Sequence, residues 1–213
     1  MIVQRGEGPG RFPQHRQYVS YLREVFRRRC AYCLTPDDRL GGEEGMKVDH
    51  FAPESRFPNL ILSWDNLYYC CDVCNNRKSN FPTEAEAALG QRFIDPCTED
   101  PDNHFCLARD KNDDCKVVSL SISAEYEVKR LQFNRRPFLR DFWRELVVME
   151  RDWQHRKQLV LELSSKASDN ENVGWLLVAC DRHLSLIRDR NGDTACFSRR
   201  NRDTVCFRER RTF

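Results

Sequence analysis

Two Cys-x-x-Cys pairs stand out in this chain as residues whose type and spacing could bind a metal ion. Cys30 pairs with Cys33, and Cys71 pairs with Cys74. Each pair can chelate one ion from a tight turn, and together the pairs supply four thiolates, the donor set of tetrahedral zinc. A site with four protein ligands has no open position, so we expect this zinc to be structural rather than catalytic.

Other cysteines leave alternatives open. In the stretch CCDVC either Cys70 or Cys71 could be the third ligand, and the spacing of the first pair favours Cys71. A second site near His104 is a weaker candidate, because its cysteines lack the tight turn of a chelating pair. These cysteines are Cys97, Cys106 and Cys115. The alternative for any cysteine is a small buried hydrophobic side chain, which we expect for Cys180, Cys196 and Cys206.

Between and beside the two pairs lie side chains that could hydrolyse a phosphodiester. In chain order they are Asp49, His50, Asn66 and Asn75. A carboxylate and an amide oxygen are donors that Mg²⁺ or Mn²⁺ accepts, and a histidine beside such an ion can deprotonate water. Two cations follow, Arg77 and Lys78, where they could bind a nucleic-acid phosphate. Taken alone, the Asp-His step could instead be a hydrogen-bonded pair at the end of a strand.

In this order the residues resemble the ββα-metal core of HNH endonucleases, including the HNH domains of RNA-guided nucleases. The matching stretches are VDHFAPES and WDNLYYCCDVCNNRKSN. The family pattern is Asp-His, a middle asparagine, and then histidine or asparagine followed by a lysine on the next turn. Many such nucleases also hold this core together with two Cys-x-x-Cys pairs. This chain has asparagine, not histidine, at the last position, which favours Mg²⁺ over softer ions.

The resemblance implies a role for each matching residue. His50 is the general base that activates water, and Asp49 is a ligand of the catalytic ion. Asn66 fastens the loop between the strands and thereby orients the histidine. Asn75 completes the metal site, and Lys78 matches the family lysine. The resemblance therefore implies a metal-dependent endonuclease that cleaves DNA, with structural Zn²⁺ and catalytic Mg²⁺ or Mn²⁺.

A second, less specific resemblance covers roughly residues 5–150. The segments RGEGPGRF, FIDPCTEDPDNHF and LQFNRRPFLRDFW resemble a bacterial HNH group that accompanies retrons and Septu-type antiphage systems. In that group the nuclease stands beside an SMC-like ATPase, so the resemblance implies a nuclease subunit of a defence complex with an ATPase partner. The alternative is a zinc-stapled nucleic-acid-binding or scaffold subunit that does no chemistry.

The element pattern predicts an α+β fold, mainly α, in which a zinc-stapled ββα-metal core has helical N- and C-terminal elaborations. We expect an arm and helix over 1–29, the nuclease core over 30–90, and a mostly helical region with a basic tail over 91–213. An amphipathic helix is expected over 14–29, and strands over KVDHF and KVVSLSIS. A helix opens near Cys74, and the longest helix begins at Pro137, which suits a first helical turn. The stretch NVGWLLVACDRHLSLI predicts another buried helix.

Composition limits the class of protein. Hydrophobic residues make up 40% and charged residues 32% of the chain, which is typical of a soluble globular protein. No apolar run approaches the roughly 18 residues of a membrane helix, and the first residues lack a signal-peptide core. We therefore expect a cytoplasmic protein, whose thiols stay reduced.

The charge distribution is uneven along the chain. The net charge is only +2, but residues 1–29 hold seven arginines against two acidic residues, and residues 186–213 hold eight against four. These basic ends could form a phosphate-facing patch. Two solvated arginine-rich faces are the alternative.

Overall fold

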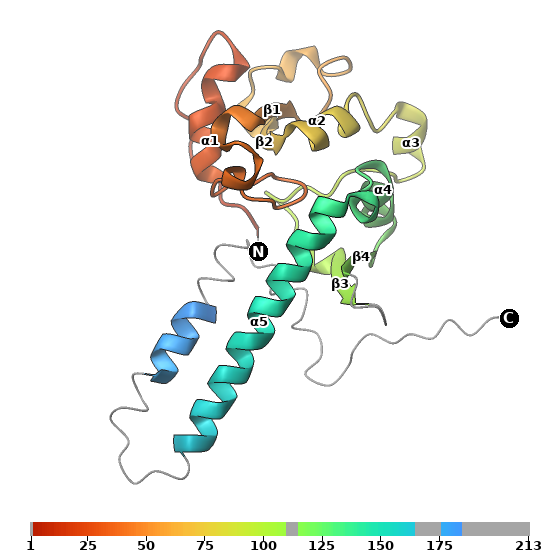
Figure 1. Cartoon of the computed structure of the whole chain (residues 1–213). Coiled ribbons are helices and arrows are strands. Elements are labelled where there is room, and N and C mark those ends of the chain that lie inside the picture. The colour runs from red at the N-terminus through yellow and green to blue at the C-terminus, as the bar shows by residue number, and fades with distance from the viewer. Residues whose placement is uncertain (1, 110–114, 165–175, 185–213) are drawn as a thin grey trace, which may run out of the picture.

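Two β-hairpins and a set of helices, of which α5 is the longest, make up the part of the chain that this computed structural model describes (Figure 1). The structure describes residues 2–109, 115–164 and 176–184. The α-helices and strands are α1 (Val19–Val25), β1 (Met46–His50), β2 (Leu67–Cys71), α2 (Asp72–Lys78), α3 (Glu84–Ala88), β3 (Phe105–Arg109), β4 (Cys115–Ser119), α4 (Ile122–Arg130) and α5 (Pro137–Ser164). The 3-10 turns are η1 (His15–Tyr18), η2 (Asp37–Leu40), η3 (Gly42–Gly45), η4 (Pro58–Leu60), η5 (Trp64–Asn66), η6 (Pro101–Asn103) and η7 (Phe133–Arg135). This mixed architecture, with small antiparallel sheets, confirms the α+β class.

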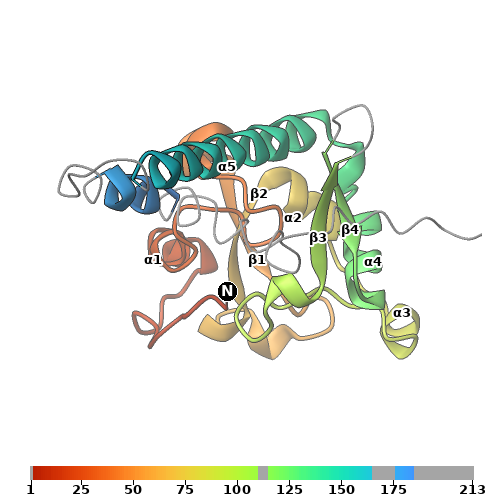
Figure 2. The same ribbon diagram turned by 90° about the horizontal axis from the view of Figure 1, so that it is seen from below.

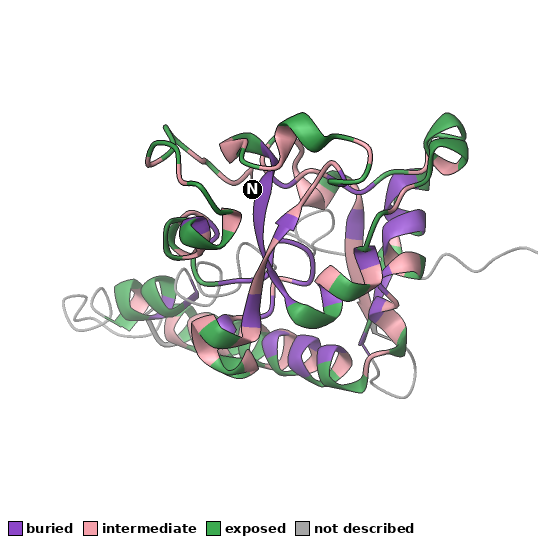
Figure 3. Ribbon diagram, turned by 90° about the horizontal axis from the view of Figure 1, so that it is seen from above, coloured by how far each residue is buried: buried purple, intermediate pink, exposed green. Residues whose placement is uncertain are grey.

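The first hairpin and the helix that follows it form a ββα unit. Strands β1 and β2 pair antiparallel, with Asp49 opposite Tyr68 and His50 opposite Leu67. Helix α2 begins directly after β2 and contacts both strands. Strand β2 is buried along its whole length (Figure 3). A strand without polar alternation needs cover on both faces, and β2 lies between α1 and α2 (Figures 1 and 2).

Helix α1 is shorter than the helix expected over 14–29. It follows the 3-10 turn η1 and ends at Val25. Arg27 and Arg28 have φ angles of 50° and 59°, in the left-handed region that interrupts a right-handed helix. The expected apolar face is nevertheless present, because Tyr18, Leu22 and Phe26 are buried.

A second hairpin occupies part of the region expected to be mostly helical. Strands β3 and β4 pair antiparallel, with Leu107 opposite Val117 (Figure 2). Val117 is buried while its two neighbours on β4 are exposed, the alternation of a half-buried strand. The strand expected over KVVSLSIS ends at Ser119, because the Ser121 side chain accepts a hydrogen bond from the Ala124 amide and caps α4.

Helix α5 begins at Pro137 as expected and extends away from the rest of the molecule (Figure 1). Its first half packs on the core through buried Leu139, Phe142, Trp143 and Leu146. Farther along, the exposed apolar side chains of α5 are Met149, Leu159 and Leu161.

The helix over 176–184 lies beside α5 but is not the buried helix expected from its composition. The ring of His183 stacks on Trp153 of α5, with ring centroids 4.1 Å apart. Leu176 and Val178 are 54% and 60% exposed. Burial in this helix is confined to Cys180 and Leu184. A single partner helix covers only one face, so the other apolar side chains remain in solvent.

The N-terminal arm is attached to the core. The Arg5 guanidinium donates to the carbonyls of Trp64 at 2.6 Å and Leu67 at 2.7 Å, and it lies 4.3 Å from the centroid of the Tyr68 ring. Arg5 therefore does not belong to the basic surface patch expected at the N-terminus. Arg23 forms an ion pair with Asp37, and Arg29 is buried, so these two do not belong to it either. The arginines of this segment that are exposed are Arg11, Arg16, Arg27 and Arg28.

Some expectations fall on residues outside the described ranges. They concern the basic tail over 186–213, Cys196 and Cys206. Among the helices that the structure describes, none combines the length and the apolar character needed to cross a membrane.

Candidate functional site

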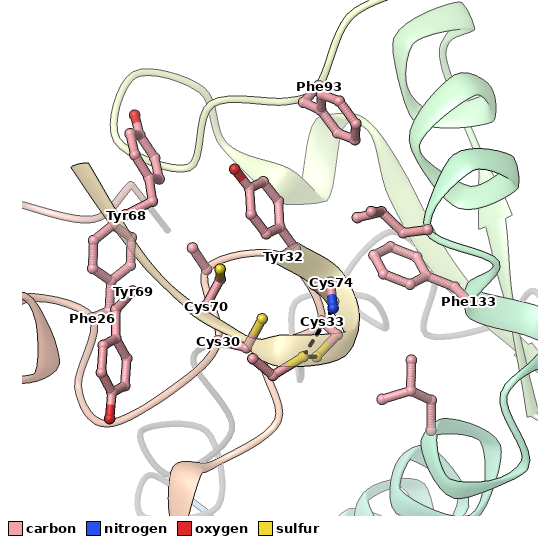
Figure 4. Close-up of a cluster of buried hydrophobic side chains, with 14 of the residues drawn as sticks. Phe26, Cys30, Tyr32, Cys33, Tyr68, Tyr69, Cys70, Cys74, Phe93 and Phe133 are labelled. Carbon is pink, nitrogen blue, oxygen red and sulfur yellow. Dashed lines mark hydrogen bonds between the residues drawn. The ribbon is translucent and has the colours of Figure 1, made fainter. Parts of the chain in front are cut away.

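Four buried thiols meet where the first Cys-x-x-Cys turn faces the junction of β2 and α2; Figure 4 labels three of these residues, Cys30, Cys33 and Cys74. The Sγ atoms of Cys30, Cys33, Cys71 and Cys74 all lie within 4.8 Å of one another. Zn–S bonds of about 2.3 Å place the sulfur atoms of a tetrahedral site about 3.8 Å apart. The Sγ atoms of Cys33 and Cys71 are 3.9 Å apart. The Cys33–Cys71 pair thus has the sulfur spacing of a tetrahedral zinc site, and all four thiols are close enough to share one ion.

Cys70 lies outside this cluster. Adjacent residues of a strand point to opposite faces, and the Cys70 Sγ lies 3.9 Å from Oδ1 of Asn75. Cys71 instead faces the other thiols, and its sulfur accepts a hydrogen bond from the Cys74 amide at 3.4 Å. Hydrogen bonding from the thiols, that of Cys30 foremost, lowers the pKa of Cys71, which favours the thiolate that a metal binds. The structure therefore selects Cys71 as the third cysteine of the cluster.

The weaker candidate site, around His104, is not formed in the part of the chain that the structure describes. Among the described residues, the four-cysteine cluster is the one group of histidine, cysteine or acidic side chains with metal-binding geometry. The His104 ring instead pairs with Glu99 at 3.3 Å and contacts the Ser121 hydroxyl at 2.9 Å.

Arg136 brings a positive charge to the thiol cluster from the start of α5. Its Nη1 lies 3.2 Å from the Cys74 sulfur, and its Nη2 lies 3.9 Å from the Cys71 sulfur. A zinc ion with four thiolates carries a net charge of about −2, and a buried charge requires a partner. Although burial acts in the opposite direction, the Cys74 thiolate raises the pKa of Arg136. Sequence analysis missed this residue because no local spacing links Arg136 to the cysteines.

Asp49, near the end of β1, is held by a buried lysine. The Lys78 ammonium lies 3.2 Å from Oδ1 and 3.0 Å from Oδ2 of Asp49, and donates to the His50 carbonyl at 2.6 Å. The Tyr32 hydroxyl donates to Oδ2 at 2.5 Å. Burial raises the pKa of the Asp49 carboxyl, and the charge of Lys78 opposes that rise.

This position of Lys78 differs from the one expected for contact with nucleic acid. The side chain is 0% exposed, and an ammonium enclosed in this way does not reach a phosphate outside. Lys78 instead joins the last turn of α2 to β1. Arg77, its neighbour, is half-exposed and is the cation of α2 with access to solvent.

The hydrogen bonding of His50 defines its tautomer. Nε2 lies 2.9 Å from the carbonyl oxygen of Ile61. A carbonyl oxygen can only accept, so Nε2 carries a proton, and in the neutral ring Nδ1 presents its lone pair. Nδ1 lies 3.9 Å from a carboxylate oxygen of Glu54, and the His50 side chain is 11% exposed. A histidine in this state can accept a proton through Nδ1.

Asn66 is tied to the loop between the strands. Its Oδ1 accepts from the Ala52 amide at 2.7 Å, and its Nδ2 donates to the carbonyls of Ala52 at 3.1 Å and Leu60 at 3.2 Å. The same loop carries Ile61, whose carbonyl binds His50. The amide of Asn66 therefore stabilises the loop conformation that orients the imidazole.

Asp49 and Asn75 carry oxygen donors of the kind that bind a hard divalent cation. Asn75 lies on α2, the helix that also carries Lys78. The Asn75 side chain contacts Cys70 of β2, the strand that pairs with β1, and β1 carries Asp49. Carboxylate and amide oxygens are typical Mg²⁺ ligands. A carboxylate has about four lone-pair sites, and three contacts to Asp49 are accounted for by Lys78 and Tyr32. The chemistry of the donors therefore fits such an ion, which would share Asp49 with Lys78.

A second histidine beside His50 was not expected from the sequence. The centroids of the His15 and His50 rings are 5.1 Å apart, with an interplanar angle of 73°. Burial foremost, and then the charge of His50, lowers the pKa of His15. His15 belongs to η1, far from the Asp-His step in the chain, so spacing offered no signal for it.

Comparison with known proteins agrees with this geometry. Residues 30–81 match the model of the HNH endonuclease family. That segment contains both Cys-x-x-Cys pairs, β1, β2 and α2. The similarity to an HNH endonuclease domain is thus shown for residues 30–81.

The chain also resembles two Septu proteins. It is 34% identical to Septu protein PtuB of Bacillus thuringiensis over 92 residues, which cover 40% of this chain and 33% of that protein. It is 29% identical to Septu protein PtuB of Bacillus mycoides (strain KBAB4) over 111 residues, which cover 40% of this chain and 37% of that protein. The matches thus span about a third of the length of these relatives. No solved structure matches the chain significantly.

Replacement of Cys74 by serine should remove bound zinc, because three thiolates and a hydroxyl form a poorer site, and binding energy at a structural site is folding energy. We expect Cys74→Ser to lose zinc in elemental analysis and to melt at a lower temperature. Cys70→Ser is the matched control and should keep one zinc ion per chain. Full zinc occupancy in Cys74→Ser would contradict this assignment of ligands.

Replacement of Lys78 by methionine should leave Asp49 buried without a counterion. Breaking one partner of a buried pair costs about 3–5 kcal/mol, so Lys78→Met should lower the free energy of unfolding by that order. The double variant Asp49→Asn, Lys78→Met should recover much of the loss. Urea denaturation in magnesium-free buffer measures the free energy of unfolding of the wild type, of each single variant, Lys78→Met and Asp49→Asn, and of the double variant. Strictly additive effects of the two single replacements would show that the ion pair has little coupling energy.

Proposed function

We propose that this protein is a metal-dependent HNH endonuclease that hydrolyses phosphodiester bonds in DNA. The observation that best supports the proposal is the state of His50. Its Nε2 is bound to the Ile61 carbonyl, so Nδ1 is the available base, one residue from a carboxylate that could hold the catalytic ion.

In the proposed reaction His50 takes a proton from the attacking water through Nδ1. A neutral imidazole is suited to this task near neutral pH. The Ile61 carbonyl holds the ring, and Asn66 stabilises the loop that carries this carbonyl. Once protonated, the ring has the Glu54 carboxylate close to Nδ1, which stabilises the imidazolium.

Asp49 and Asn75 would hold the catalytic Mg²⁺ or Mn²⁺. When bound, such an ion stabilises charge on the phosphate and on the leaving oxygen. Lys78 and Tyr32 position the Asp49 carboxylate by hydrogen bonds to both of its oxygens. We assign Lys78 this positioning role in place of the phosphate contact suggested by its sequence position.

We propose DNA as the substrate on the basis of the HNH domain and of cations at the surface. Arg77 is half-exposed on α2, and exposed arginines of the N-terminal segment include Arg11 and Arg16. Cationic side chains provide sequence-independent attraction for phosphates, which weakens steeply with salt.

We further propose a role in antiphage defence with an SMC-like ATPase partner, in the cytoplasm. The likeness to Septu proteins supports the first part. Exposed apolar side chains on α5 provide surface that a protein partner could cover: Met149, Leu159 and Leu161. The nine described cysteines form no disulfide bond, which suits a reducing compartment.

A subunit that binds nucleic acid without cleaving it is the second candidate. It is favoured by one observation, namely that Lys78 already neutralises the Asp49 carboxylate. A catalytic ion must then bind beside an ammonium group, which repels it.

The His50→Ala variant should separate the two candidates. Loss of a general base lowers rates by about 10² to 10⁴, so plasmid cleavage with Mg²⁺ should fall by at least that lower factor, while DNA binding and zinc content persist. Asn76→Ala is a matched control on α2, where Asn76 contacts only the exposed Asp72 among the hydrogen bonds described. Equal cleavage by wild type and His50→Ala would exclude this active site.

This chain and its ATPase partner should elute together in size-exclusion chromatography. We expect the chain alone to cleave little at physiological salt, because charge-based DNA binding is then weak, at about 10⁻⁴ to 10⁻⁶ M. Mixing it with an ATPase encoded beside it should shift both proteins in size-exclusion chromatography and raise cleavage. A Leu159→Glu, Leu161→Glu variant should lose the shift if α5 is the contact. Strong cleavage without any shift would indicate a freestanding nuclease.

A further inference from the structure

The N-terminal arm is fixed both to the HNH segment and to the loop around Pro96. The Val3 amide donates to the Pro96 carbonyl at 2.7 Å, and Arg5 binds the carbonyls of Trp64 and Leu67. The arm thus reaches the loop and the strand that follow His50 in the chain. The arm itself lies outside residues 30–81, the part that matches the HNH family, whereas Trp64 and Leu67 lie inside that part.

The end of the arm is folded around Tyr18. This side chain is buried, and its hydroxyl accepts from the Phe12 amide at 3.0 Å and lies 3.2 Å from the Gly10 carbonyl. The Gln14 amide donates to the Gln17 side chain at 3.1 Å and caps η1. The 3-10 turn that carries His15 is therefore held in place from both of its ends, and it packs against β1.

The contact between His15 and His50 restrains the tilt of the His50 ring, which the hydrogen bond to Ile61 does not fix. A hydrogen bond from Nε2 to the Ile61 carbonyl fixes the far end of the His50 ring. The ring can still tilt about the line from Cβ to Nε2, and such a tilt moves the lone pair of Nδ1. An edge-to-face neighbour at 5.1 Å and 73° opposes this motion.

We propose that His15 is a positioning residue of the active site, which holds the ring plane of His50 so that Nδ1 points at the attacking water. The inference rests on the proposed nuclease function and extends it beyond the HNH segment. The role needs the shape of an aromatic ring and does not need His15 to donate or accept a proton. The N-terminal arm is then part of the catalytic unit.

Charged groups on four segments lie near the two histidine rings. They are Asp49 on β1, Glu54 on the following loop, Lys78 on α2, and His15 with Arg16 on η1. Replacing His15 by a neutral ring leaves the other four in place, so the ring and its titration can be tested separately.

The test compares His15→Ala with His15→Phe in the 213-residue chain, using plasmid cleavage with Mg²⁺ at low salt. Misplacement of a reacting group by about 1 Å can cost about 10²-fold in rate. We expect His15→Ala to lower kcat by about tenfold or more with little change in KM, and His15→Phe to stay within about threefold of wild type. His155→Ala, an exposed histidine on α5, is the control. Zinc content and melting temperature are measured for every variant.

Three results would overturn the proposal. They are an unchanged kcat in His15→Ala, an equal loss in His15→Phe and His15→Ala, and a loss that follows a fall in melting temperature or zinc content. Rescue of kcat by phenylalanine in a stable, zinc-loaded protein supports it. His50→Ala, assayed in parallel, distinguishes a failure of the proposed active site from a failure of the role proposed for His15. If it cleaves normally, the proposed active site fails and the role of His15 fails with it; if it is inactive while His15→Ala is normal, only the role of His15 fails.

Discussion

The convergence of four thiols is the constraint on which the rest of the structure depends. It joins the turn after α1 to the junction of β2 and α2, and through Arg136 it reaches α5. Structural zinc sites contribute about 10–16 kcal/mol in small domains, whereas whole domains are stable by only about 5–15 kcal/mol. A zinc ion bound here would therefore account for a stabilisation as large as that of the fold itself. The positions of Asp49 and His50 depend on the same hairpin.

Helix α2 shows how little the local sequence determines by itself. It has seven residues, and isolated helices shorter than about 12–15 residues are marginal in water. Cys74 fixes it near its first turn, and Lys78 fixes its last turn through Asp49. The buried lysine contributes geometry more than stability, because the cost of removing both charges from water offsets much of their attraction. Asn75 lies between these two attachments, so its placement follows from them.

Much of the fold could be predicted from local signals. The four cysteines follow from tight-turn spacing, β1 and α2 from the stretches around them, and the start of α5 from Pro137. Other features depend on contacts between distant segments. Two arginines with positive φ end α1 early, although arginine has no intrinsic preference for that conformation.

The contacts of charged side chains were the least predictable part. Arg5, Lys78 and Arg136 are all buried or half-buried, and each is neutralised or hydrogen-bonded by a segment far away in the chain. A sequence pattern identifies such residues as cations and cannot tell whether their partner is a nucleic acid or the protein itself. The same limit applies to His15, which reaches His50 through the folding of the arm.

Because Arg136 contacts the thiols directly before α5 begins, one end of this long helix is held at the cysteine cluster. The helix has 28 residues, which at about 1.5 Å per residue is about 42 Å. Its inner end lies beside the four thiols through Arg136, and its outer end points away from the core (Figure 1). A rotation of about 5° at the inner end moves the outer end by about 4 Å, if the helix stays rigid. A small change of angle where Arg136 meets the sulfur atoms would thus move the outer end of α5 by about the width of a side chain.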